Sequence, residues 1–189
     1  NGFISAPVHS SVSGTVKGIE IIKDLAGNPC KAVVIAVEGD EWVETIDRSE
    51  EIVRDIKLDS KAIIDRIKEC GVVGLGGATF PTNVKLSPPP GKKAEFLIIN
   101  GAECEPYLTS DYRNMLERAE ELLTGVEILM RAVNVERAVI GVENNKPDAI
   151  AHLREVIEKD SYKGIEVMPL KMRYPQGGEK QLIAAVTGR

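Results

Sequence analysis

Cysteine is scarce in this chain, and its few copies are scattered. The 189 residues include only Cys30, Cys70 and Cys104. An odd number of distant cysteines, with no Cys-x-x-Cys pair, argues against a disulfide framework and against a zinc or iron–sulfur site made by this chain alone. Reducing, cytoplasmic surroundings are therefore expected.

Histidine and long apolar runs are also rare. Neither His9 nor His152 is predicted to bind a metal, and His152 falls on a helical pattern as an expected surface residue. No Ser–His or Cys–His arrangement can be argued, so hydrolysis is disfavoured and no catalytic side chain is assigned. No run of about 18 apolar residues predicts a membrane span. The net charge of −5 disfavours nucleic acid as a partner.

The first part of the chain has the pattern of a small β-module. Short β-branched segments cover 6–16, 19–22 and 32–37, with a turn at 26–29. Segment 6–16 reads APVHSSVSGTV, which resembles the half-repeat of biotinyl and lipoyl carrier domains. The modified-lysine motif of those carriers is absent, so a structural module is expected. A charged linker over 38–58 follows it.

From residue 59 onward, helix and strand patterns alternate. Helices are predicted over 61–69, 110–133, 147–159 and 180–187. Apolar strands are predicted over 96–99, 138–142 and 165–170. This alternation is typical of a parallel sheet.

The predicted fold class is α/β, with a Rossmann-like parallel sheet and flanking helices. A small β-module, part of a barrel-sandwich hybrid, precedes it. The predicted domains are 1–58, the β-module and linker, and 59–189, the α/β domain. The sequence does not begin with Met. We therefore expect a piece of a longer protein, with the second domain truncated at its C-terminus.

The stretch GVVGLGGATFPTNVK, residues 71–85, is the richest in glycine. Gly74, Gly76 and Gly77 let backbone N–H groups approach a ligand, and Lys85 adds a positive charge. Such a loop is a plausible cradle for phosphate. It is not the dinucleotide fingerprint, because Thr79 stands where the third glycine belongs, and no Walker A lysine follows. A tight turn without any ligand is the alternative.

Two further loops follow predicted strands. NGAECEP covers 100–106 after one strand, and YPQGGE covers 174–179 after another. Because ligands bind at the carboxyl ends of strands in open α/β sheets, we expect these loops and the glycine loop to meet at one edge.

The side chains of these loops suit a nucleotide better than a nucleophilic reaction. Asn100 can donate and accept hydrogen bonds, as ribityl hydroxyls or a flavin edge require. The carboxylates of Glu103, Glu105 and Glu179 can accept hydrogen bonds from ribose hydroxyls or a carboxamide. Phe80 can lie against an adenine ring. A solvated carboxylate is the alternative for each acid taken singly.

The three loops together resemble those of the flavin- and NADH-binding subunit of respiratory complex I. That family has GRGGAGFPTGxKW, then NADEGEPG, then YxxGEE, in the same order and at similar spacing. The closer resemblance is to RnfC, a subunit of the Rnf electron-transport complex. Its loops read GLGGATFPT and GAECEPYLTSD, as here, and a β-module precedes its flavin domain.

The resemblance implies which residues hold the ligands. It implies non-covalent FMN at Gly74, Gly76, Gly77, Lys85, Asn100, Glu103, Tyr174 and Gly177. It implies NADH contacts by Phe80, Glu105 and Glu179.

The resemblance also implies a role. The chain would be the electron-input module of an Rnf-type ion-translocating complex and an NADH-dependent flavin oxidoreductase. It would take hydride from NADH onto FMN and pass electrons to [4Fe–4S] clusters carried only by the full-length protein. Its partners would be other membrane subunits of the complex, with ferredoxin as the electron partner. It would lie peripherally at the cytoplasmic face of the membrane.

Four positions depart from the complex I motifs: Ala102 replaces Asp, Gly178 replaces Glu, Leu75 replaces Arg and Leu86 replaces Trp. These departures predict fewer polar contacts to the flavin and weaker affinity. Two alternatives stay open. One is a cobalamin reductase of the propanediol-utilisation type, and the other is a scaffold module that has lost its flavin.

Overall fold

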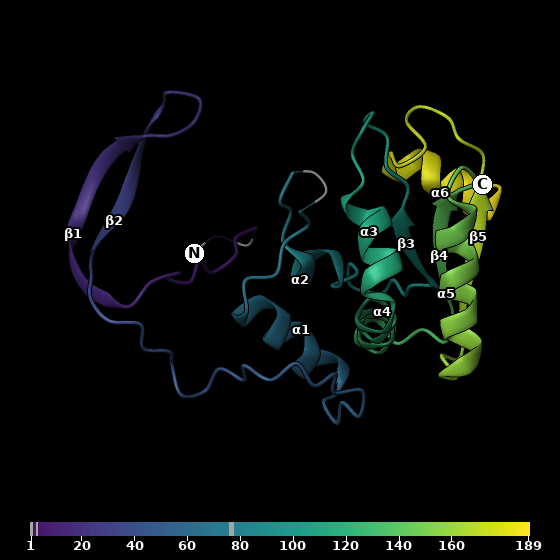
Figure 1. Ribbon diagram of the computed structural model, residues 1–189, viewed down its shortest axis with the longest axis horizontal. Coiled ribbons are helices and arrows are strands. Elements are labelled where there is room, and N and C mark those ends of the chain that lie inside the picture. Colours follow the sequence, from purple (N-terminus) through teal and green to yellow (C-terminus); the bar gives the residue numbers. More distant parts are fainter. Residues whose placement is uncertain (1, 3, 76–77) are drawn as a thin grey trace. The chain divides into compact units, whose positions relative to one another are not determined.

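The computed structural model describes residues 2, 4–75 and 78–189 (Figure 1). The chain forms two compact units. One is Val8–Glu51, and the other is Ile52–Arg189 with a short N-terminal segment that ends at Pro7. Gly76 and Gly77 of the predicted flavin site lie outside the described residues.

The unit Val8–Glu51 contains an antiparallel hairpin of β1 (Gly14–Lys23) and β2 (Pro29–Val37). Its turn is closed by Asp24, whose Oδ1 accepts hydrogen bonds from the backbone N–H groups of Ala26 (2.9 Å) and Asn28 (2.8 Å). The predicted strands 19–22 and 32–37 lie inside this hairpin. The predicted β segment 6–16 is strand only from Gly14 onward, where it pairs with β2.

The second unit is built on a parallel sheet, which confirms the predicted α/β fold class. Its three strands lie in the order β3-β4-β5, with β4 in the centre. The strands are β3 (Leu97–Gly101), β4 (Ala138–Glu143) and β5 (Ile165–Leu170). Every residue of β4 is buried, as expected for a central strand covered on both faces.

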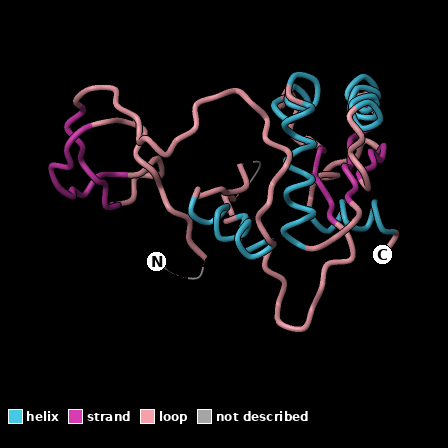
Figure 2. The backbone as a smooth tube through the Cα atoms, turned by 90° about the horizontal axis from the view of Figure 1, so that it is seen from below, coloured by secondary structure: helices cyan, strands magenta, loops and turns pink. Residues whose placement is uncertain are grey.

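Helices cover both faces of this sheet. On one face, apolar side chains of three helices form the core with Ile140 and Val142 of β4. Those helices are α3 (Ser110–Glu117), α4 (Ala119–Val133) and α5 (Pro147–Lys159). On the other face lies α6 (Glu179–Thr187), where a Cβ on Gly141 would stand 2.9 Å from Leu182 Cδ1. Figure 2 shows the strands of this unit between the helices.

One long predicted helix is in fact two. Residues 110–133 are interrupted at Arg118, whose φ of −133° and ψ of 38° are not helical. The prediction was wrong here because no Gly or Pro marks the break. The apolar spacing of Met115, Ala119 and Leu123 also runs through it, and all three are buried.

Two helices precede the sheet. The first is α1 (Ser60–Glu69), which confirms the predicted helix, and Asp59 Oδ1 caps it by accepting from the Ala62 N–H at 2.8 Å. The second is α2 (Thr82–Lys85), which follows the glycine loop. The sequence did not predict α2, because a single helical turn has no apolar periodicity to detect.

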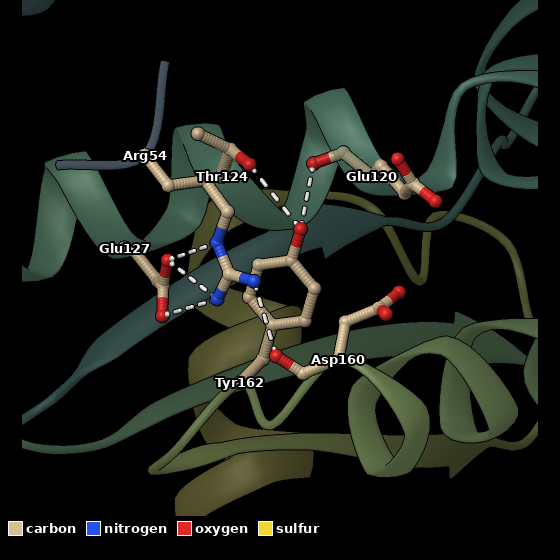
Figure 3. Close-up of polar contacts among 6 residues, drawn as sticks. All are labelled: Arg54, Glu120, Thr124, Glu127, Asp160 and Tyr162. Carbon is tan, nitrogen blue, oxygen red and sulfur yellow. Dashed lines mark hydrogen bonds and ion pairs between the residues drawn. The ribbon is translucent and has the colours of Figure 1, made fainter. Parts of the chain in front are cut away.

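Part of the predicted linker packs on the α/β unit through Arg54 (Figure 3). Its guanidinium lies over the ring of buried Tyr162, 3.9 Å from Cζ to the ring centre. It also donates to the Glu127 carboxylate at 3.2–3.4 Å and to the Asp160 carbonyl at 3.0 Å. We call residues 52–58 the strap, because these contacts hold them against α4 and the end of α5.

Candidate functional site

The loop after β3 and the loop before α6 interlock. Asn100 Nδ2 donates to the Gly177 carbonyl at 2.9 Å, and Asn100 Oδ1 accepts from the Ala102 N–H at 3.2 Å. The Gly177 N–H in turn donates to Cys104 Sγ at 3.2 Å. Both loops lie at the carboxyl ends of the strands, so the sheet edge favoured for ligands carries them as one connected surface.

Gly177 has to be glycine at this contact. A Cβ there would stand 2.9 Å from the Ala102 carbonyl oxygen and 3.1 Å from Cys104 Sγ. Since one neighbour is backbone, a side chain would push the two loops apart. The glycine that the sequence assigned to the cofactor therefore also allows close packing between the loops.

The glycine loop is closed at its base by backbone hydrogen bonds. The Gly74 N–H donates to the Phe80 carbonyl at 3.0 Å, and the Thr82 N–H donates to the Val72 carbonyl at 3.0 Å. Lys85 Nζ lies 3.4 Å from where a Cβ on Gly74 would stand. Among the described residues the Lys85 side chain forms no ion pair or hydrogen bond.

The structure links two of the three predicted loops. Among the described residues, no hydrogen bond or ion pair joins the glycine loop to the loops at 100–106 and 174–179. The meeting of all three loops around one ligand stays a prediction.

A buried ionic cluster lies beneath the loop after β3. The Glu103 side chain is 1% exposed, and its Oε2 lies 2.9 Å from Lys146 Nζ. Lys146 Nζ is also 3.5 Å from Glu143 Oε2. Glu103 Oε1 accepts from the Asp111 N–H at 2.7 Å, which gives α3 the N-terminal cap that Thr109 does not provide. Burial, and then the charge of Glu103, raises the pKa of the Asp111 carboxyl.

A second contact joins the first turns of α3 and α5. The Tyr112 hydroxyl donates to Asp148 Oδ2, and this hydrogen bond lowers the pKa of the Asp148 carboxyl and raises the pKa of the Tyr112 phenol. The ion pairs of Lys146 and the contact between Tyr112 and Asp148 therefore link α3, α5 and the loop after β3.

The sequence did not single out Glu143, Lys146 or Asp111. A signal was present, because Glu143 is the last residue of β4. Ligands bind at the carboxyl ends of parallel strands, so Glu143 could have been considered together with the loop at 100–106. What the sequence could not show is the burial of Glu103. The structure places that carboxylate under the loop, engaged with Lys146 and α3.

The remaining predicted residues are more open to solvent. Tyr174 is 82% exposed and Glu105 is exposed on its loop, whereas Phe80 is half-buried. Glu179 is exposed in the first turn of α6, where a carboxylate also favours the helix dipole. These positions suit contact with a molecule that arrives from solvent.

An open cavity of about 330 Å³ lies elsewhere, at the α3–α4 break. Its lining includes Arg118, His152 and Lys159 and none of the predicted site residues. Over the described part of the chain, no helix is both long and apolar enough to cross a bilayer.

Two family models match this chain. Residues 67–189 match the model described as the Nuo51 FMN-binding domain, and residues 1–40 match the RnfC barrel sandwich hybrid domain. The air-oxidized NAD⁺-reducing [NiFe]-hydrogenase has a similar fold, with a TM-score of 0.59 and 25% identity. That match covers 69% of this chain and 24% of the hydrogenase chain.

Curated relatives match along the whole chain. The C subunit of the proton-translocating ferredoxin:NAD⁺ oxidoreductase complex of Clostridium ljungdahlii is 47% identical, over 100% of this chain and 40% of the relative. The C subunit of the Na⁺-translocating ferredoxin:NAD⁺ oxidoreductase complex of Acetobacterium woodii is 48% identical, over 100% of this chain and 42% of the relative. The chain thus spans well under half the length of these proteins. It belongs to the Nuo51 FMN-binding domain family and, as its loop motifs predicted, is of the RnfC type.

Proposed function

We propose that the α/β unit binds FMN and receives NADH, as the electron-input module of an Rnf-type complex. The observation that carries the proposal is the interlocking of the loops at 100–106 and 174–179 at the carboxyl edge of the sheet. It occurs in a chain that belongs to an FMN-binding domain family.

The residues present fit a flavin nucleotide. Lys85 has no acidic partner among the described residues, and its ammonium lies near Gly74. A positive charge beside a backbone without a side chain suits a phosphate group. Lys85 and the backbone of Gly74, Gly76 and Gly77 would hold the phosphate. Asn100, Gly177 and Tyr174 would contact the rest of the flavin.

Glu103 has a different part in this proposal from the other acids. Because its carboxylate is buried against Lys146 and caps α3, it would support the FMN pocket from beneath. Exposed Glu105 and Glu179 would accept hydrogen bonds from the hydroxyls or carboxamide of NADH, and Phe80 would lie against its adenine.

Bound FMN would supply the redox chemistry, accepting hydride from NADH and releasing electrons one at a time. The side chains of this chain would bind and orient the two nucleotides, and none has to act as an acid or base. The interlocked loops would hold the site in one geometry. The electrons would leave through iron–sulfur clusters of the full-length protein.

The wider setting is also part of the proposal. The names of the relatives describe ion-translocating complexes that join ferredoxin and NAD⁺. We extend this to the present chain, with other membrane subunits and ferredoxin as partners and with a peripheral place at the cytoplasmic face. The domain boundary after residue 58 stays a prediction.

The test is a titration of the purified protein with FMN, followed by anaerobic addition of NADH. We expect a bound-flavin spectrum that NADH bleaches. Lys85→Met should weaken FMN binding about tenfold or more through the lost charge at the phosphate. Lys92→Met, at an exposed lysine outside the loops, is the matched control. No flavin binding at excess FMN would leave the scaffold alternative.

A further inference from the structure

Tyr107 has an unusual backbone conformation for its residue type. It is one of four non-glycine residues with positive φ in the described part of the chain. At φ +66° an L-residue other than Gly, Asn or Asp is held in a region that costs about 1–2 kcal/mol. Such strain persists at functional sites when the side chain is needed there.

The other three residues lie at a helix end, in a turn after a helix and in the glycine loop. Asn134 (φ +56°) ends α4 as a left-handed C-cap, and Ser161 (φ +58°) lies in the turn just after α5. The Thr79 hydroxyl donates to the Ala78 carbonyl at 2.7 Å. Tyr107 has no such contact among the described residues, and its side chain is fully exposed, at 102%.

The turn that carries Tyr107 directs it outward. The Leu108 N–H donates to the Glu105 carbonyl at 3.2 Å, which closes a four-residue turn with Pro106 in second place. Positive φ at the third place is what a type II turn requires, and Gly or Asn normally provides it. Because the Tyr107 ring is fully exposed in the described part of the chain, it is open to contact with another molecule.

The position of the turn indicates which molecule. Glu105 opens the turn on the loop that contacts Gly177, while Glu103 anchors that loop from below. If Glu105 accepts hydrogen bonds from a ribose, the base of the same nucleoside lies within reach of a tyrosine two residues on. A fully exposed ring suits a ligand that binds and leaves, as a substrate does, better than a resident cofactor.

We infer that Tyr107 is a substrate-binding residue whose ring stacks on a planar heteroaromatic ring of the nicotinamide dinucleotide. This inference rests on the proposed function, since it requires the dinucleotide to bind at this edge. The turn fixes the backbone that carries the ring before the substrate arrives, which lowers the backbone ordering needed on binding.

The experiment uses the FMN-loaded protein and measures NAD⁺ binding by calorimetry, thermal unfolding, and the rate of flavin bleaching by NADH. Tyr107→Gly should raise the Kd for NAD⁺ about tenfold, as loss of one aromatic stack does. The same variant should keep its thermal midpoint or raise it, because the strain is removed. Tyr107→Phe keeps the ring and should bind NAD⁺ as the parent does.

Ser161→Gly is the matched control, because it relieves positive φ at an exposed residue away from the loops. It should keep or raise the midpoint and leave the Kd for NAD⁺ unchanged. Unchanged NAD⁺ binding in Tyr107→Gly would overturn the inference and assign the ring to another partner. If that variant loses both NAD⁺ and stability, Tyr107 is structural and the inference is also overturned. Failure of the parent to bind FMN would instead overturn the proposed function.

Discussion

The hairpin unit and the α/β unit contain similar proportions of β-branched residues in their strands but differ in burial. All residues of Val8–Glu51 are described, and none of them is buried. The cross-strand pair Ile19 and Val33 is 68% and 60% exposed. In the α/β unit, Val139 and Ile140 of β4 are at most 1% exposed.

This contrast shows that strand formation and core formation have different causes. A tight turn capped by Asp24 and β-branched side chains suffice for the hairpin. Burial comes only where helices cover a sheet, as α3, α4 and α5 do for β4. A two-stranded ribbon alone is marginally stable in water, so we expect the α/β unit to account for the stability of the chain.

The largest effect is expected where charge is buried. Lys146→Met would leave Glu103 and Glu143 without their cation, and removing one partner of a buried pair costs about 3–5 kcal/mol. Lys61→Met removes an exposed partner of Asp65 and should change the unfolding free energy by less than about 0.5 kcal/mol. Urea denaturation followed by circular dichroism measures both. A loss below about 1 kcal/mol for Lys146→Met would mean that the cluster is solvated.

The next effect compares the two apolar surfaces directly. Leu153→Ala, at a fully buried side chain of α5, should lower the unfolding free energy by about 2–5 kcal/mol. Ile21→Ala, at a side chain 66% exposed in β1, should change it by no more than about 0.5 kcal/mol. The same denaturation measurement applies. A large loss for Ile21→Ala would break the comparison, because it would show that the hairpin face is covered in solution.

Both units contain an arginine stacked on an aromatic ring, but the ring is exposed in the hairpin unit and buried in the α/β unit. Arg54→Ala removes a guanidinium stacked on buried Tyr162 and should cost about 2 kcal/mol. Arg48→Ala removes one stacked on exposed Trp42 and should cost about 0.5 kcal/mol. Arg54→Ala should also speed proteolysis within the strap. Equal costs for the two variants would mean that the strap contributes no more to the unfolding free energy than the contact of Arg48 with Trp42 does.

The smallest effect is a pH dependence that arises from Asp111 in the α/β unit. Because burial and Glu103 raise the pKa of Asp111, the folded state holds that proton more tightly than the unfolded chain. Stability from this group is complete below its ordinary pKa of 3.8 and is lost as the pH rises through the raised value. Asp111→Asn should therefore become more stable, relative to the parent, as the pH increases over that interval. A difference that does not vary with pH would contradict this assignment.

Much of the α/β fold followed from local patterns. The apolar runs at 138–142 and 165–170 predicted β4 and β5, and the helical spacing of apolar residues over 61–69 predicted α1. The break at Arg118 was missed because hydrophobic spacing does not report a single non-helical residue. The strap was missed because Arg54 meets partners 73 and 106 residues away, which no local pattern encodes.

The candidate site divides in the same manner. Three motifs in a fixed order identified the loops and the family, because the positions of glycine and acidic residues can be read directly from the sequence. They could not show that Glu103 is buried against Lys146, or that Asn100 and Cys104 hold Gly177. Those contacts depend on which strand ends are neighbours, and β3, β4 and β5 become neighbours only through parallel pairing.

The sequence by itself determined the strands, most helices and the types of side chain offered at the loops, because propensity and periodicity act over a few residues. Only the tertiary structure decided which of those side chains are buried, which face solvent, and which distant loop each one meets. The physical reason is that burial and ionic pairing arise when the chain closes long loops to pack helices onto the sheet. Glu103 and Glu105, two residues apart, have opposite environments for that reason alone.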